Sequence, residues 1–126
     1  MGLPRVLVID DTPAVSATVR LLLEGLCDVT IAANAAEAVA AITGTRFEAV
    51  LCDLYLPDAS VEELATRLGQ ADPGLISHLV LMSGAIDDPL PGMFGQVPPN
   101  RRLRKPFSLE ELLPALADAG AMAQVT

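Results

Sequence analysis

Hydrophobic and polar positions change along the chain in blocks that fit strands and helices in turn. Short apolar runs, too short to form helices, predict strands at residues 5–9, 28–32, 49–52, 78–82 and 102–104. Longer stretches with apolar residues at helical spacing follow the first three runs and the last one. Because strands that alternate with helices form parallel sheets, this pattern predicts an α/β fold.

Polar residues at the expected helix starts support the alternation. Thr12 is the expected N-cap of the first helix, because Pro13 suits the first helical position, where its missing N–H has no partner. In the other three helices a capping side chain is followed three residues later by a glutamate: Asn34–Glu37, Ser60–Glu63 and Ser108–Glu111. Pro114 lies inside the last predicted helix, where it predicts a kink or a later start.

The segment between residues 83 and 102 does not fit the alternation. It reads GAIDDPLPGMFGQVPPNR, with four prolines and three glycines where a fourth crossover helix is expected. A proline in a helix interior costs ~3 kcal/mol, so the segment has room for a turn or two of helix at most. We expect an irregular and mobile connection here.

Length and composition set the class of protein. At 126 residues we expect one domain spanning 1–126, with no output domain attached. Hydrophobic residues make up 52% and charged residues 19%, which indicates a globular chain and not a disordered one. No apolar run approaches the roughly 20 residues that span a bilayer, so no membrane association is expected.

The same data limit the compartment and the partners. The N-terminus lacks the pattern of a secretory signal. Cys27 and Cys52 lack metal-ligand spacing, so a reducing, cytoplasmic setting is the simpler interpretation. A net charge of −8 argues against direct contact with nucleic acid, because phosphate contacts need a basic surface.

Polar side chains follow four of the five predicted strands. Asp10 and Asp11 follow the first, Asp53 the third, Ser83 the fourth and Lys105 the fifth. In a parallel sheet these strand ends share one edge, which is where open α/β sheets keep their ligand sites. We therefore expect these five side chains to meet.

Such a cluster has a definite chemistry. Three carboxylates repel each other, so they need a cation or raised pKa values. Mg²⁺ is the natural cation, because it prefers oxygen ligands and is content with one or two carboxylates plus water. With a hydroxyl from Ser83 and a positive charge from Lys105, the set could hold a phosphoryl group, with Asp53 as the nucleophile. The alternatives are a structural salt-bridge network, or a solvated loop position for Asp53 taken alone.

Four motifs, in order, resemble the receiver domain of two-component response regulators. They are VLVIDD (residues 6–11), VLCDLYLPD (50–58), LVLMSG (79–84) and KPF (105–107). The resemblance implies a flavodoxin-like, doubly wound sheet of five parallel strands in the order 2-1-3-4-5, with helices on both faces. It also implies that Asp53 accepts a phosphoryl group from a phosphohistidine on a sensor histidine kinase or phosphotransfer protein. A changed surface then reports this to a downstream protein, which the sequence does not identify.

The resemblance also implies a role for each site residue. Asp11 and Asp53 would bind Mg²⁺ directly, together with the main-chain carbonyl of Tyr55, and Asp10 would act mostly through water. Ser83 would hydrogen-bond a phosphoryl oxygen. Lys105 would pair with the phosphoacceptor and then with the phosphoryl group, and the peptide bond that follows Lys105 would be cis.

Two departures from the family pattern fall on one surface. Three residues before the lysine, receiver domains usually have a tyrosine or phenylalanine that turns inward on activation, and here that position holds Arg102. The fourth crossover, normally part of the output and dimer face, is the proline-rich segment. We therefore expect an unusual read-out and leave homodimerisation open.

The basic residues near the fifth strand allow two interpretations. Four of them hold half of the positive charge of the chain: Arg101, Arg102, Arg104 and Lys105. They predict either a solvated strand edge or a docking patch for an acidic partner.

Three classes of function remain open. The leading one is a signalling domain that is not an enzyme on outside substrates and performs only its own phosphorylation and dephosphorylation. The second is a pseudo-receiver that binds a partner without phosphorylation. The third is a phosphohydrolase that works through an aspartyl phosphate, although such enzymes separate their two first-strand aspartates and here Asp10 and Asp11 are adjacent.

Overall fold

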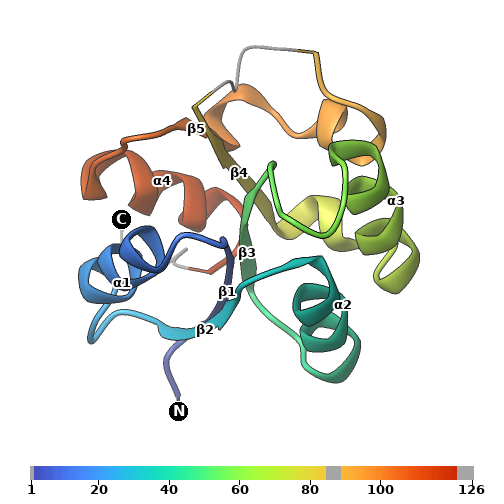
Figure 1. Cartoon of the computed structure of the whole chain (residues 1–126). Helices are drawn as coiled ribbons and strands as arrows, with labels where there is room; N and C mark the ends of the chain where they lie inside the picture. Colours follow the sequence, from blue (N-terminus) through green and yellow to red (C-terminus); the bar gives the residue numbers. More distant parts are fainter. Residues whose placement is uncertain (1, 85–88, 122–126) are drawn as a thin grey trace.

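The structure is a computed structural model that describes residues 2–84 and 89–121. Five parallel strands form one sheet in the order β2-β1-β3-β4-β5 (Figure 1). The strands are β1 (Arg5–Ile9), β2 (Asp28–Ala32), β3 (Ala49–Asp53), β4 (Leu79–Ser83) and β5 (Arg102–Arg104). The predicted flavodoxin-like sheet is therefore confirmed. The third strand ends one residue later than expected, and the fourth both begins and ends one residue later.

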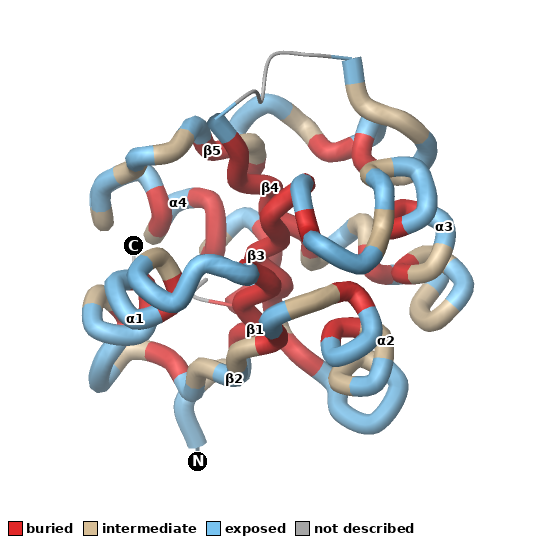
Figure 2. Tube along the Cα trace, in the orientation of Figure 1, coloured by how far each residue is buried: buried red, intermediate tan, exposed pale blue. Residues whose placement is uncertain are grey.

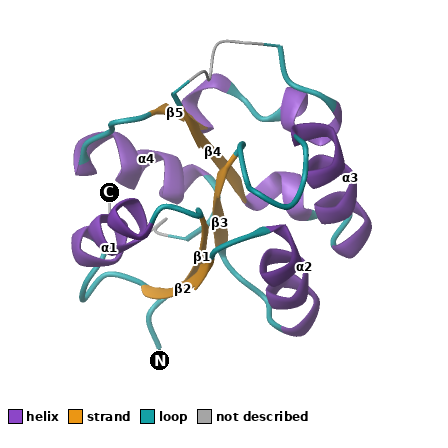
Figure 3. Ribbon diagram, viewed as in Figure 1, coloured by secondary structure: helices purple, strands orange, loops and turns teal. Residues whose placement is uncertain are grey.

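Four α-helices cover the two faces of this sheet. Figure 3 shows α1 (Pro13–Leu22) and α4 (Leu109–Asp118) on one face, and α2 (Ala35–Gly44) and α3 (Val61–Ala71) on the other. None of the helices in the described parts of the chain is long and apolar enough to cross a membrane. Pro114 lies inside α4, which begins at Leu109, so the proline does not delay the start of the helix.

The central strand β3 is buried along its whole length. Its side chains alternate between two cores, because successive residues of a strand point to opposite faces. Val50 and Cys52 pack on the α2–α3 side, while Ala49 and Leu51 pack on the α1–α4 side. Figure 2 shows the resulting band of buried chain through the middle of the molecule. Asp53 thus stands at the end of a strand that packing holds on both faces.

The predicted helix caps are largely confirmed. Both the start of α3 at Ser60 and the start of α4 at Ser108 have a complete capping box, in which side chain and backbone bond reciprocally. The start of α2 differs from the prediction. Asn34 accepts the N–H of Glu37 at 2.8 Å, but the Glu37 carboxylate accepts the N–H of Ala33 and not that of the capping residue.

The proline-rich fourth crossover contains two short 3₁₀ helices, η2 (Gly92–Gln96) and η3 (Pro99–Arg101), in place of an α-helix. The predicted irregularity is therefore confirmed. The side chains of Phe94 and Val97 are 0% and 1% exposed and belong to the α2–α3 core. Residues 92–97 are therefore packed against the core, whereas residues 85–88 of the same connection lie outside the described residues, and the expected mobility stays a prediction.

Candidate functional site

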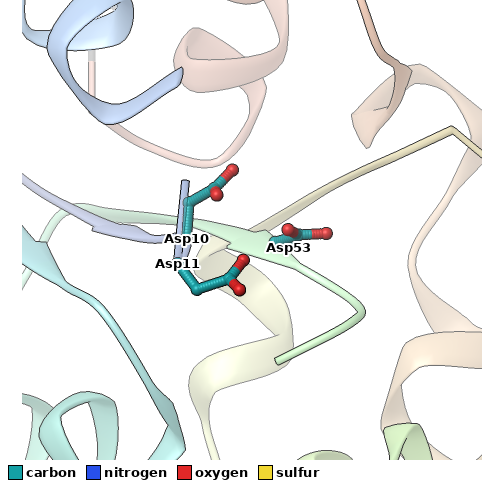
Figure 4. A group of neighbouring side chains, drawn as sticks. All are labelled: Asp10, Asp11 and Asp53. Atoms are coloured by element: carbon teal, nitrogen blue, oxygen red, sulfur yellow. The ribbon is translucent and has the colours of Figure 1, made fainter. Parts of the chain in front are cut away.

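The sheet topology brings three aspartates together at the carboxyl edge. Asp10 and Asp11 directly follow β1, and Asp53 ends the neighbouring strand β3. Figure 4 shows the three side chains at this edge, and one carboxylate oxygen from each lies within 4.8 Å of the other two. Asp10 and Asp53 are buried, while Asp11 is exposed to solvent. An all-oxygen set that is partly open to water fits a hard cation such as Mg²⁺, which keeps several of its waters.

Lys105 places its ammonium group between two of these carboxylates. Its Nζ lies 2.8 Å from Oδ2 of Asp10 and 3.1 Å from Oδ2 of Asp53. The lysine follows β5, and its backbone N–H donates to the carbonyl of Ser83 at 3.0 Å. The Lys105–Pro106 peptide bond is cis, as the sequence led us to expect. One basic side chain thus links the ends of the first, third and fifth strands.

Burial and charge shift the ionisation of this group. Burial raises the pKa of Asp53, and the charge of Asp10 adds to this, while the hydrogen bond and charge of Lys105 act in the opposite direction. For Lys105, burial lowers the pKa, but the hydrogen bonds and charges of Asp10 and Asp53 outweigh burial and hold the pKa above its ordinary value. Lys105 therefore stays cationic at neutral pH, which is the state needed to bind a developing anion.

Asp10 also fixes the start of α1. Its Oδ1 accepts the backbone N–H of Thr12 at 2.7 Å. Thr12 occupies the N-cap position, as predicted, but its side chain makes no capping hydrogen bond. Asp10 thus uses one oxygen for the helix start and the other for Lys105.

Ser83 and Tyr55 lie beside the carboxylates. Ser83 ends β4, the neighbour of β3, and is 1% exposed. Tyr55 follows Asp53 in the loop that leads to α3. The N–H of Tyr55 donates to Oδ1 of Asp53 at 3.4 Å, and Tyr55 is 53% exposed. The five predicted side chains therefore come from strand ends that meet at one edge, and Tyr55 lies next to them.

Asp58 is a residue of this region whose role the sequence did not indicate. It lies on the loop between β3 and α3, and its two carboxylate oxygens accept the N–H groups of Ala35 and Ala36 at 2.8 and 3.0 Å. These partners open α2, which precedes Asp58 in the chain by more than 20 residues. Local sequence patterns do not predict such a distant partner, and the only signal was a second aspartate in the motif of Asp53.

The basic residues near β5 bond groups of the chain, and Arg104 among them is exposed to solvent. Arg101 is 9% exposed and bonds Asp118 at 3.2 Å and the carbonyl of Ile76 at 2.9 Å. Arg102 donates to the carbonyls of Val97, Phe94 and Gly95 at 2.8, 3.4 and 3.0 Å. With Lys105 in the carboxylate site and Arg104 donating to the carbonyl of Gly84 at 3.3 Å, all four cations bond groups of the chain itself. The docking patch for an acidic partner stays a prediction.

Comparison with known proteins agrees with this geometry. Residues 6–117 match the family model described as the response regulator receiver domain. Among curated proteins, the probable transcriptional regulatory protein TcrX of Mycobacterium tuberculosis is 33% identical over 110 residues, covering 86% of this chain and 46% of TcrX. The transcriptional regulatory protein TcrA of the same species is 33% identical over 113 residues, covering 89% of this chain and 44% of TcrA. The chain spans about half the length of these relatives.

Solved structures share the fold. A CheY-like response regulator receiver domain from Methylobacillus flagellatus matches with a TM-score of 0.78 and 28% identity, over 94% of this chain and 99% of that one. The receiver domain of the sensor histidine kinase PA1611 from Pseudomonas aeruginosa PAO1, solved with a magnesium ion in its active site cleft, matches with a TM-score of 0.77 and 22% identity. That match covers 92% of this chain and 96% of that one, and it shows the fold alone. The family match, the curated relatives and the sheet order agree, and the chain belongs to the response regulator receiver domain family.

Proposed function

We propose that this receiver domain is a phosphoacceptor, with Asp53 as the residue that carries the phosphoryl group. The observation that carries the proposal is the position of Lys105, whose Nζ lies within 3.1 Å of carboxylate oxygens of both Asp10 and Asp53. A cation fixed beside a buried nucleophilic carboxylate can bind the charge that develops on a transferred phosphoryl group.

A bound Mg²⁺ would supply positive charge to the phosphoryl oxygens and reduce the repulsion between the carboxylates. The residues that would hold it are Asp11 and Asp53, with the main-chain carbonyl of Tyr55, while Asp10 would act mostly through water. The oxygens of the three aspartates, gathered within 4.8 Å of one another, support this assignment.

The chain's own residues would divide the transfer among them. A carboxylate oxygen of Asp53 attacks the phosphorus, a new P–O bond forms, and the P–N bond of the donor phosphohistidine breaks, so that its electron pair stays on the imidazole. The ammonium group of Lys105 pairs first with the Asp53 carboxylate and then with the phosphoryl oxygens. Ser83, at the adjacent strand end, donates its hydroxyl hydrogen to one of them.

The phosphodonor partner needs a surface beside Asp53. An apolar groove of about 380 Å³ lies next to Lys105, between α1 and the start of the α4 region, and it includes Val15, Leu22 and Phe107. We propose that a sensor histidine kinase or phosphotransfer protein docks over this groove, because apolar side chains next to the site can bury against a partner helix.

The remaining expectations stay proposals. We propose a cytoplasmic location and no direct contact between this domain and nucleic acid. The curated relatives are named as transcriptional regulators and are about twice as long as the part that matches.

The test is the intact mass of the protein after incubation with acetyl phosphate and Mg²⁺. We expect the wild type to gain one phosphoryl group, and we expect no gain without Mg²⁺ or in the variant Asp53→Asn. An unchanged mass under conditions that label another receiver domain would overturn the proposal. It would favour a pseudo-receiver, for which the replacement of the usual aromatic residue by Arg102 is the supporting observation. Steady consumption of acetyl phosphate with rapid turnover would favour a phosphohydrolase.

A further inference from the structure

Asp58 joins the loop that follows Asp53 to the start of α2. Each of its carboxylate oxygens accepts a different backbone N–H, from Ala35 at 2.8 Å and from Ala36 at 3.0 Å. The N–H of Ala35 is the largest of the effects that hold the pKa of Asp58 below its ordinary value. Asp58 is therefore ionised near neutral pH. Both of its carboxylate oxygens accept hydrogen bonds, although the residue is exposed.

The loop between Asp53 and Asp58 is short and anchored. Leu54 is 0% exposed and Leu56 is 8% exposed, so both leucines pack into the α2–α3 core, and Leu56 forms an antiparallel bridge with Ala59. Tyr55 lies between the two leucines. Its carbonyl can therefore move only as far as these anchors and the Asp58 contact allow.

The other end of the contact is tied to the carboxylate site. The start of α2 directly follows β2, and the carbonyl of Ala32 at the end of β2 accepts the N–H of Asp10 at 3.0 Å. A continuous series of contacts thus leads from Asp53 through Asp58 and α2 to Asp10. Figure 1 shows the loop after β3 passing close to α2. A shift of the loop away from α2 would change the spacing of groups on both sides of the cation site.

We propose that Asp58 is a positioning residue for cation binding. By holding the loop against α2, it sets the position of the Tyr55 main-chain carbonyl relative to Asp11 and Asp53. This inference rests on the proposed function, since it needs a cation at the carboxylate cluster. The alternative is that Asp58 only caps α2, as an acidic group at a helix N-terminus does in many proteins.

Asn34 separates these two roles. It caps the same helix by accepting the N–H of Glu37 at 2.8 Å, whereas the loop after Asp53 is held by the carboxylate of Asp58. Asn34→Ala therefore removes a helix cap and leaves the loop contact in place. Glu62, exposed in the first turn of α3, provides a second control, because Glu62→Gln removes one negative charge from the same region without breaking the Asp58 contact.

The experiment is a Mg²⁺ titration at physiological salt, followed by calorimetry and by the emission of Tyr55. Tyr55 is the only tyrosine in a chain without tryptophan, so the signal comes from the loop itself. We expect Asp58→Ala to raise the Kd for Mg²⁺ about tenfold, as loss of a residue that orients a metal ligand does. Asp58→Asn, which keeps one acceptor oxygen, should fall between Asp58→Ala and wild type. Asn34→Ala should change the Kd less than roughly twofold, because it leaves the Asp58 contact in place. Glu62→Gln should change it equally little, because an exposed charge is screened at this salt concentration.

Four outcomes would overturn the inference. Equal weakening in Asp58→Ala and Asn34→Ala would show that helix capping accounts for the effect, and equal weakening in Asp58→Ala and Glu62→Gln would show that charge does. Unchanged affinity in Asp58→Ala, with thermal melting showing a folded variant, would remove the positioning role and leave the proposed function intact. If the wild type itself bound no Mg²⁺, the proposed function would fail together with the inference.

Discussion

The Nζ of Lys105 lies closer to Asp10 than to the expected phosphoacceptor, at 2.8 Å from the Asp10 carboxylate. The side chain of Asp10 is 0% exposed, so this carboxylate depends on Lys105 and on the N–H of Thr12 for its partners. Removing one partner of a buried pair leaves an uncompensated charge, which is costly. The lysine therefore contributes to the stability of the domain as well as to its proposed chemistry.

The first prediction concerns Lys105→Ala in the absence of divalent cations. We expect a loss of about 2 kcal/mol in the free energy of unfolding, because three carboxylates remain without their cation. Mg²⁺ should raise the melting temperature of this variant more than it raises that of the wild type. Arg104→Ala is the matched control, since it removes a positive charge from the neighbouring residue, which donates to the carbonyl of Gly84. An equal response to Mg²⁺ in wild type and variant would contradict the prediction.

The second prediction concerns the pH dependence of the Asp58 contact. The pKa of Asp58 is lowered in the folded chain. At pH values below the ordinary pKa of an aspartate, the unfolded chain therefore binds more protons than the folded chain does. The stabilisation is therefore complete above about pH 4 and is lost as the pH falls through the lowered pKa. We expect the difference in unfolding free energy between wild type and Asp58→Ala to shrink on acidification. Urea unfolding at a series of pH values measures this, and a constant difference down to the lowest pH would refute it.

The third prediction concerns Arg102, which bonds three carbonyls of residues 94–97. In Arg102→Ala these carbonyls lose their donor, so we expect faster amide hydrogen exchange in peptides that cover residues 92–101. Arg102→Lys keeps the charge but lacks the planar guanidinium that reaches three acceptors. It should therefore restore only part of the protection against hydrogen exchange. The control is Arg104→Ala, which removes the same charge from a residue that donates to the carbonyl of Gly84. The same protection in wild type and Arg102→Ala would rule out the role of the arginine.

The fourth prediction concerns Phe94, which is 0% exposed and anchors η2 in the α2–α3 core. Phe94→Ala should cost about 3 to 4 kcal/mol in the free energy of unfolding, because the removed ring leaves a cavity. The neighbouring Met93→Ala should cost clearly less, since Met93 is only partly buried. Urea unfolding compares the two, and equal losses would show that η2 does not depend on its aromatic anchor.

Sequence patterns predicted most of the fold because its signals are local. Each of these signals involves residues that are close together in the sequence. Examples are the alternation of strands and helices, the capping box of Ser60 and Glu63, and the prolines of the fourth crossover. The meeting of Asp10, Asp53 and Lys105 was also predictable, because the ends of parallel strands share one edge.

The contacts that the sequence did not predict join residues far apart in the chain or depend on packing. Asp58 finds its partners at the start of α2, and no local pattern marks that pairing. The inward bonds of Arg101 depend on where η1 (Leu75–His78) and α4 end. The packing of residues 92–97 depends on Phe94, whose burial requires a pocket formed by distant helices.

The inward direction of Arg101, Arg102 and Lys105 also affects how partners approach the domain. The chain has a net charge of −8, and these three cations bond its own carbonyls and carboxylates, which leaves a predominantly acidic exterior. Such an exterior attracts partners with a basic surface and repels acidic ones over several ångströms of solvent. Association with a cognate partner should therefore be accelerated by long-range attraction at low ionic strength and should slow as salt is added.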